Sequence, residues 1–330
     1  MRLKLVLVFL VCLAVHGAEK KPVPPAKPGV KKPGVQLPMS LLKPDATFEI
    51  PGSPDWIAVG DAVWVSNFPK NSVTRIDPKT NKIDAVVEVG KSPCAGLAIA
   101  FDSLWVPLCG DHALVRVDLK TNKITASIPT TIGDSEGGIA AGAESIWIVT
   151  DKKGTLARID PATNKIVAEI EVPAGSYTPA FGEGAVWVTG TDSGVVSRVN
   201  PMNNLVEETI KVGPKPRFLA VGMGAVWVLN QGDGSVSKID PKTNKVDQTI
   251  EVGVPGPGGD IAVGEGSVWV TSFDFPISRI DPVKNEVVQQ FKGPGGDALR
   301  TGLGSVWLSC YALHREQRYD PKRIQATVAE

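Results

Sequence analysis

Short hydrophobic runs recur along this chain, and one of them is repeated seven times in nearly the same form. A tryptophan lies inside each copy, at positions 64, 105, 147, 187, 227, 269 and 307. Successive copies are 41, 42, 40, 40, 42 and 38 residues apart. An Asp or Asn follows each tryptophan by thirteen residues, or by twelve in the sixth copy, at Asp77, Asp118, Asp160, Asn200, Asp240, Asp281 and Asp320. Two landmarks with one period indicate a repeat protein.

Each repeat predicts four short β-strands, and the sixth shows them at residues 260–263, 267–272, 277–281 and 286–291. The second of these is apolar on both faces, which is typical of a strand covered on both sides. The fourth strand of the fifth repeat, residues 245–252, alternates apolar and polar positions, so one of its faces meets water. Glycine-containing pairs such as 265–266 predict a tight hairpin between the first two strands. The segment Asp-Pro-Lys-Thr-Asn-Lys at 77–82 and 240–245 predicts the turn between the last two.

Seven repeats of four antiparallel strands predict an all-β protein, a seven-bladed β-propeller that spans residues 46–330. The chain lacks long runs with helical periodicity, which excludes a helical solenoid. Two segments read as the fourth strand of the last blade, residues 46–51 and 323–328. The pattern leaves open which of them closes the ring.

The N-terminus has the pattern of a targeting segment. Arg2 and Lys4 precede an apolar run over residues 5–15, and the small residues Gly17 and Ala18 follow. This pattern predicts a signal peptide over residues 1–18, because the apolar run is too short for a transmembrane helix. Residues 19–45 are rich in Lys and Pro and predict a semi-extended linker. We therefore expect a secreted or periplasmic protein without a transmembrane segment.

Charge narrows the range of partners. The chain holds 35 basic and 35 acidic residues, but the linker has six Lys against Glu19 and Asp45. The propeller segment keeps 27 basic and 33 acidic residues and is mildly acidic. Because contacts to phosphate dominate affinity for nucleic acids, we expect no nucleic-acid partner. We expect a monomeric protein whose partner is a small molecule, a glycan or a protein.

Residues typical of catalysis are scarce. Only His112 and His314 remain after the signal peptide, and no spacing typical of a zinc site occurs. No nucleophile elbow or phosphate-binding loop is present either. We therefore assign no catalytic residue and no cofactor, although carboxylates at the mouth of the propeller could hold a divalent cation.

Two cysteines flank the first two strands of the second repeat. The expected hairpin turn at residues 101–102 places Cys94 directly opposite Cys109, within disulfide distance. Export to an oxidising compartment favours the bond, and Cys310 would remain free. The alternative is that both are small buried side chains.

The candidate site follows from the direction of the strands. Loops that enter first strands and leave second strands share one face of the propeller, here called the mouth face, and the repeated turns share the opposite turn face. Blades six, seven and one are neighbours in a closed ring. Each has a carboxylate at the start of its first strand and an aromatic residue four positions after the repeated tryptophan: Asp260 and Phe273, Asp297 and Tyr311, Asp55 and Phe68, with Trp56 nearby.

These seven residues, together with Arg217 on the opposite side of the ring, are the eight predicted ligand-binding residues. Glu136 and Tyr177 are expected to face them across the ring. Aromatic faces beside carboxylates suit a sugar or an organic cation. The alternative interpretation is that each carboxylate caps a turn and each aromatic packs between blades.

The motifs Val-Trp-Val, Ser-Arg-Ile-Asp-Pro and Thr-Asn-Lys resemble the YVTN-type propeller repeats of secreted bacterial proteins. More distantly, the chain resembles the virginiamycin B lyase-like propellers, over residues 46–330. The second resemblance implies His and Glu at the mouth together with Mg²⁺. No His occurs at the corresponding first-strand positions of this chain, which are Trp56, Gly96, Gly138, Thr178, Phe218, Asp260 and Ala298. The sequence therefore favours a non-enzymatic binding module, with a cation-dependent lyase or lactonase and a structural surface protein as alternatives.

Overall fold

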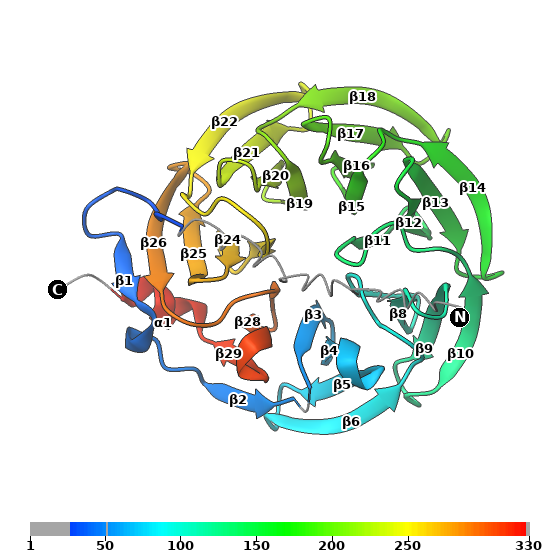
Figure 1. Ribbon diagram of the computed structural model, residues 1–330, viewed down its shortest axis with the longest axis horizontal. Coiled ribbons are helices and arrows are strands. Elements are labelled where there is room, and N and C mark those ends of the chain that lie inside the picture. Colours follow the sequence, from blue (N-terminus) through cyan, green and yellow to red (C-terminus); the bar gives the residue numbers. More distant parts are fainter. Residues whose placement is uncertain (1–26, 51, 328–330) are drawn as a thin grey trace, which may run out of the picture.

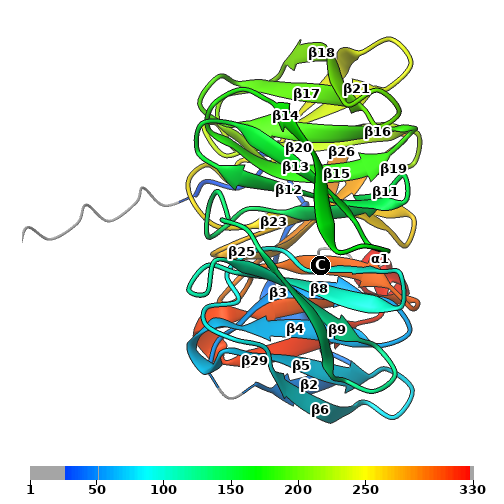
Figure 2. The same cartoon turned by 90° about the vertical axis from the view of Figure 1, so that its right-hand side faces the viewer.

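The protein is a ring of seven antiparallel β-sheets, seen along its axis in Figure 1 and from the side in Figure 2. This computed structural model describes residues 27–50 and 52–327. The all-β, seven-bladed propeller with four-stranded blades is confirmed; the sixth blade carries one additional strand. Blades are numbered 1 to 7 in chain order.

Each blade runs from the axis to the rim of the ring. The innermost strands of blades 1 to 7 are β3 (Pro54–Val59), β7 (Ala98–Ala100), β11 (Ile139–Gly142), β15 (Ser176–Gly182), β19 (Pro216–Gly222), β23 (Asp260–Gly264) and β27 (Leu299–Gly302). The second strands are β4 (Val63–Asn67), β8 (Ser103–Leu108), β12 (Ser145–Asp151), β16 (Ala185–Gly190), β20 (Ala225–Asn230), β24 (Ser267–Ser272) and β28 (Ser305–Cys310).

The two outer positions complete the blades. The third strands are β5 (Ser72–Asp77), β9 (Ala113–Asp118), β13 (Thr155–Asp160), β17 (Val195–Asn200), β21 (Ser235–Asp240), β25 (Phe275–Asp281) and β29 (Arg315–Tyr319). The outermost strands are β6 (Lys82–Glu88), β10 (Ile124–Pro129), β14 (Lys165–Glu171), β18 (Leu205–Lys211), β22 (Lys245–Glu251), β26 (Glu286–Lys292) and, in blade 7, β2 (Ala46–Glu49).

The repeated tryptophans lock neighbouring blades together on the turn side. All seven are almost fully buried. Trp105 shows the pattern: its indole nitrogen donates to the carbonyl of Ala100, and the Arg116 guanidinium lies over its ring. Arg116 also donates to the carbonyl of Pro161 in the next blade, at 2.6 Å, and to Asn164. The Pro-x-x-Asn turn of the next blade binds an arginine in the same way in blades 3 and 7, through Arg158 and Arg318, which links tryptophan, arginine and turn in these repeats.

The ring closes with a strand from the N-terminal side. Strand β2 pairs with β29, and Phe48 stacks on Trp307 with ring centroids 6.2 Å apart. Of the two candidate segments, residues 46–51 thus contain the closing strand. Residues 323–328 were also read as a strand, but Pro321–Ala326 form helix α1. Asp320 caps that helix by accepting from the amide of Lys322, and a proline at the first helical position favours the same conformation.

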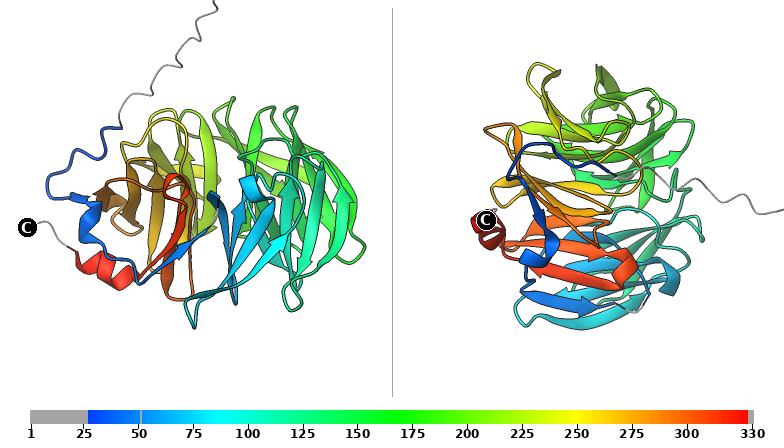
Figure 3. Two further views of the ribbon diagram at one scale, coloured as in Figure 1. Left: turned by 60° about the horizontal axis from the view of Figure 1, so that its bottom comes forward. Right: turned by 60° about the vertical axis from the view of Figure 1, so that its left-hand side comes forward.

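The structure differs from the predicted linker over residues 27–45. From Lys27 onward the chain lies along blade 6, where β1 (Gln36–Pro38) pairs in parallel with β26 as a fifth strand. Val35 and Leu37 are buried there, and the short 3₁₀ helix η1 (Met39–Leu41) follows, close to α1 (Figure 3). Two apolar side chains suffice because the backbone of the strand supplies hydrogen bonds to the sheet edge.

The predicted signal peptide, residues 1–18, lies outside the described residues, as does the linker up to residue 26. Within the described part of the chain, no helix is long and apolar enough to cross a membrane.

Cys94 and Cys109 form a disulfide bond with their Cα atoms 5.8 Å apart. The pairing register differs from the expected one, because Pro93 rather than Cys94 pairs across the ladder, and its partner is Leu108. The two cysteines therefore meet on a diagonal. Cys310 is buried and has a free thiol.

Candidate functional site

A cavity of about 410 Å³ opens on the mouth face, and we call it the mouth cavity. Six of the eight predicted ligand-binding residues line it: Asp55, Phe68, Arg217, Phe273, Asp297 and Tyr311. The other lining residues are Cys94, Ser135, Glu136, Phe218, Pro257 and Gly258. Residues from six blades, all except blade 4, and from loops far apart in sequence therefore meet in one place.

Local irregularities in the inner strands turn side chains toward the mouth. In blade 1 the register between β3 and β4 shifts, so that Asp55 and Trp56 both face Ser66, and the amide of Trp56 donates to the Ser66 hydroxyl. Similar shifts occur in blade 4 at Tyr177 and in blade 5 at Arg217. β-Bulges of this kind reorient side chains at functional edges.

Three exposed aromatic rings form one side of the cavity rim. Phe68 begins the 3₁₀ helix η2 (Phe68–Lys70), and Tyr311 begins the equivalent η3 (Tyr311–Leu313) in blade 7. Phe273 follows β24. These rings are 43%, 39% and 41% exposed, respectively, so they contribute little to the core. Gly258, with φ of +81°, lies against Phe273, and a Cβ atom there would collide with the phenyl ring.

The carboxylates of the cavity have raised pKa values. Burial, followed by the negative charges of Asp297, Glu136 and Asp260, raises the pKa of Asp55 well above its usual range. Burial and the charges of Glu136 and Asp260 raise the pKa of Asp297 to about 7. Among the residues that the structure describes, neither carboxylate accepts a hydrogen bond or forms an ion pair. Within the described part of the chain, these two acids therefore form no ion pair with a cation.

Arg217 lies across the cavity from these acids and already contacts other side chains of the protein. Its guanidinium forms an ion pair with Asp134 at 3.1 Å and stacks over the Tyr177 ring at 4.5 Å. Glu136, as expected, lines the same cavity, and its pKa is raised by burial against the opposing influence of Arg217. The cavity thus has one side with the carboxylates of Asp55 and Asp297, unpaired among the described residues, and another side where Asp134 balances the positive charge of Arg217.

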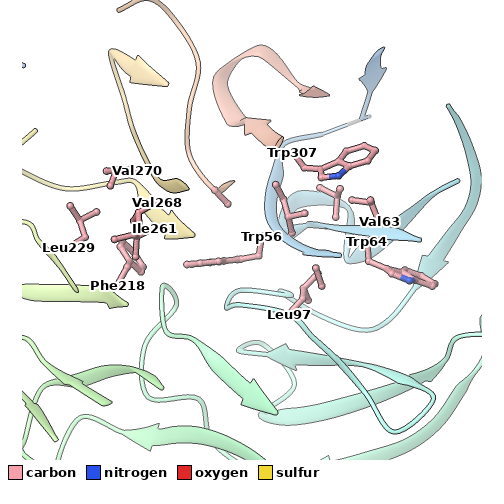
Figure 4. Close-up of a cluster of buried hydrophobic side chains, with 14 of the residues drawn as sticks. Trp56, Val63, Trp64, Leu97, Phe218, Leu229, Ile261, Val268, Val270 and Trp307 are labelled. Atoms are coloured by element: carbon pink, nitrogen blue, oxygen red, sulfur yellow. The ribbon is translucent and has the colours of Figure 1, made fainter. Parts of the chain in front are cut away.

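Two predicted residues lie elsewhere. Trp56 was expected to form a stacking wall, but it is 3% exposed and extends across the middle of the ring toward Phe218, with ring centroids 5.8 Å apart (Figure 4). It lines a second cavity of about 280 Å³ along the inner strands, called the axial cavity. Because Phe218 lines both cavities, the Trp56–Phe218 pair lies where they adjoin and forms part of the floor of the mouth cavity.

Asp260 also lines the axial cavity and not the mouth cavity. It is 3% exposed and accepts from the amides of Ile261 and Leu299 as well as from the Arg300 guanidinium. These contacts join blade 6 to blade 7. Burial nevertheless raises the pKa of Asp260 against the effect of Arg300.

Lys27 also lies at this site, although no pattern in the sequence pointed to it. Its ammonium donates to the carbonyl of Pro257 at 3.2 Å and lies 5.7 Å from the centroid of the Phe273 ring. Both partners line the mouth cavity. Burial lowers the pKa of Lys27. The residue was missed because its surroundings read as a linker.

Of the two histidines that the structure describes, neither lines the mouth cavity; His314 contacts the carbonyl of Gly52, and His112 lies in the hairpin between β8 and β9. In the described part of the chain, no three acidic, His or Cys side chains converge as ligands for a metal ion. A divalent cation at the mouth therefore stays a prediction.

No known family model matches this sequence, and no curated protein matches it. Solved structures do resemble the fold. A streptogramin B lyase structure shares 19% identity over 82% of this chain and 95% of its own, with a TM-score of 0.70. A catalytically inactive histidine-to-alanine variant of virginiamycin B lyase from Staphylococcus aureus, in complex with quinupristin, shares 19% over 84% and 98%, with a TM-score of 0.71.

Hydrazine synthase from Kuenenia stuttgartiensis shares 14% identity over 84% of this chain and 97% of its own, with a TM-score of 0.69. At these identities the likeness concerns the fold alone. The resemblance to virginiamycin B lyase-like propellers is thereby confirmed, and the chain has the architecture of a seven-bladed propeller of that kind.

Proposed function

We propose that this protein is an exported binding module that holds a small ligand in the mouth cavity. One observation carries the proposal: three exposed aromatic rings and three carboxylates from different blades line the same cavity of about 410 Å³. Pockets that bind small molecules combine apolar walls with a few polar groups in this way. The disulfide between Cys94 and Cys109 is compatible with export.

The cavity also argues against a purely structural role. A scaffold protein needs only the repeated packing of neighbouring blades for stability, and its mouth face has no reason to gather polar and aromatic groups in a hollow. Exposed apolar residues grouped beside polar ones typically mark a binding site. The mouth cavity therefore favours ligand binding over the surface-protein alternative.

The test is a binding screen with variants of the cavity. Sugars, organic amines, organic acids, Ca²⁺ and Mg²⁺ are compared by thermal shift and then by calorimetry. For any ligand found, Phe273→Ala removes a stacking surface worth about 0.5–1.5 kcal/mol. Replacing both Asp55 and Asp297 by Asn removes charge-assisted contacts worth about 1.5–3 kcal/mol each.

Matched controls lie on the turn face. Phe101→Ala removes a ring that is 37% exposed there, and Asp61→Asn neutralises an exposed turn acid. Both variants are expected to bind like the parent. If the cavity variants also bind like the parent, the ligand site is elsewhere and the proposal fails.

A lyase or lactonase activity is the second candidate. It is favoured by the structural neighbours that are streptogramin B and virginiamycin B lyases, and by Asp297, whose pKa of about 7 suits a general acid or base. The expected result for a binding module is that quinupristin stays intact, by mass spectrometry, during incubation with the protein and Mg²⁺. Turnover that disappears in Asp297→Asn would establish the enzyme instead.

A further inference from the structure

We propose that the mouth cavity selects an organic ammonium ion, and that Lys27 competes with this ligand for the ring of Phe273. The inference rests on the proposed ligand-binding function and narrows the ligand to one chemical class.

The balance of charge in the cavity is the first argument. Asp55, Asp297 and Glu136 line it without a hydrogen-bonding or ion-pairing partner for their carboxylates among the described residues. The cation in the lining, Arg217, is paired with Asp134 and stacked on Tyr177. A bound cation would supply the missing counter-charge, whereas a neutral sugar would leave the acids uncompensated.

The aromatic rim is the second argument. Phe68, Phe273 and Tyr311 present their rings at the opening next to these acids. The face of an aromatic ring attracts ammonium groups, and several rings together form a cage typical of quaternary ammonium recognition. Acids at the base and rings at the rim fit one ligand with a positive head and an apolar surface.

Lys27 provides the third argument, because a primary ammonium already occupies part of this rim. It lies over Phe273 and donates to Pro257, and both residues line the cavity. The segment that carries it is held in place on blade 6: the amide of Gly29 donates to Gly253, and that of Val30 donates to Gln290. Lys27 is thus a fixed cation on the surface where the ligand cation would bind.

The experiment compares choline with 3,3-dimethyl-1-butanol, an uncharged molecule of the same shape, by calorimetry at pH 8. The full mature protein is used. We expect choline to bind at least about tenfold more tightly than the alcohol, since its charge is the difference between the two probes. The Asp55→Asn/Asp297→Asn double variant should lose that preference.

Two further variants test the role of Lys27. In Lys27→Gln the affinity for choline should rise about two- to fivefold, which is the range of a partly exposed cation–π contact. Lys31→Gln removes an exposed charge from the same segment and should leave the affinity unchanged. An unchanged affinity in Lys27→Gln would overturn the competition.

The remaining outcomes separate this inference from the proposed function. Equal binding of choline and the alcohol, or no binding of choline, overturns the ammonium class. Binding of a sugar, Ca²⁺ or Mg²⁺ alone, weakened by Phe273→Ala or by the double variant, also overturns it but leaves the ligand-binding function intact. Choline binding that no cavity variant weakens would overturn both.

Discussion

The aspartates of the repeated turns and the aspartates that line the mouth cavity have pKa values shifted in opposite directions. On the turn face, hydrogen bonds from the turn amides and side chains, the first from the Lys79 amide to Asp77, lower the pKa of the turn acids, which are Asp77, Asp118, Asp160, Asp240 and Asp281. On the mouth face, burial raises the pKa of Asp55 and Asp297. The comparison teaches that the turn acids find hydrogen-bond donors within the fold, whereas Asp55 and Asp297 have none among the described residues.

The same division separates the aromatic residues. The repeated tryptophans are buried, and six of them donate to a backbone carbonyl five residues earlier. The rim aromatics are exposed on neighbouring blades. The rings that pack between the blades are thus different from the rings that line the mouth cavity.

The largest expected effect comes from breaking the buried set. Trp187→Ala leaves a cavity between blades and should lower the free energy of unfolding by about 3–5 kcal/mol. Phe273→Ala at the rim should change it by less than about 1 kcal/mol. Denaturant unfolding of both variants measures the difference. Similar losses in both would mean that the two classes of ring are not distinct.

A smaller effect concerns the buried acid Glu316 in β29. It accepts from the Ser309 hydroxyl at 2.8 Å, and burial raises its pKa to about 8. Because the folded protein holds this proton more tightly than the unfolded chain, the contribution of Glu316 to stability is fully present below about pH 4 and is lost as the pH rises through about 8. Glu316→Gln should therefore stabilise the protein at pH 8, by about 1–3 kcal/mol.

The gain should shrink at pH 4, where the native carboxyl is already neutral. Glu49→Gln, at an exposed position of the same blade, is the control. Thermal unfolding at both pH values gives the result, and an equal effect of Glu316→Gln at pH 4 and pH 8 would contradict the assigned pKa.

The next effect extends the comparison to binding. Since the pKa of Asp297 is about 7, choline should bind about tenfold more tightly at pH 8 than at pH 6. The groups around this carboxyl are Asp55, Glu136, Asp260 and the Cys310 thiol, with Arg217 as a cation in the same lining. Asp297→Asn should flatten the pH profile, and a profile that stays steep would assign the proton to another group.

The smallest effect is expected from a single turn acid. The pKa of Asp240 is lowered, so its stabilising contribution is present above its unfolded pKa and is lost as the pH falls through the folded value. Asp240→Asn should lower the melting temperature slightly at pH 7 and less at pH 3. Asp61→Asn changes an exposed acid in another turn and should leave the melting temperature unchanged at both pH values. An effect equal to that of Asp240→Asn would contradict the role assigned to the turn acids.

The fold follows from the sequence because two physical requirements repeat with one period. A tryptophan must fill the space between blades, and the Asp- or Asn-containing turn must join the last two strands of each blade; the carbonyl of Pro161 in one such turn also accepts from Arg116. The pattern could not decide between the two closing segments, because β2 and residues 323–328 have a similar alternation of apolar and polar residues. Only the cap at Asp320 distinguishes the latter as a helix.

The candidate site was predictable in part. Asp55, Asp297 and the rim aromatics meet because strand ends of neighbouring blades share one face. The placement of Trp56 depends on a register shift opposite Ser66, which changes where a side chain points without changing the alternation of the sequence. Asp260 was misplaced because its partner, Arg300, belongs to the next blade.

The closure of blade 7 also bears on how the chain is made. Strand β2 leaves the ribosome before every blade of the propeller, yet its partner β29 is among the last segments to emerge. Until then Phe48 has no Trp307 to stack on, and β2 has no strand to pair with and stays open to other chains. Translation of almost the whole chain therefore precedes the step that seals the ring, so arrest of the ribosome late in the message would release a product with six complete blades and an unsatisfied sheet edge.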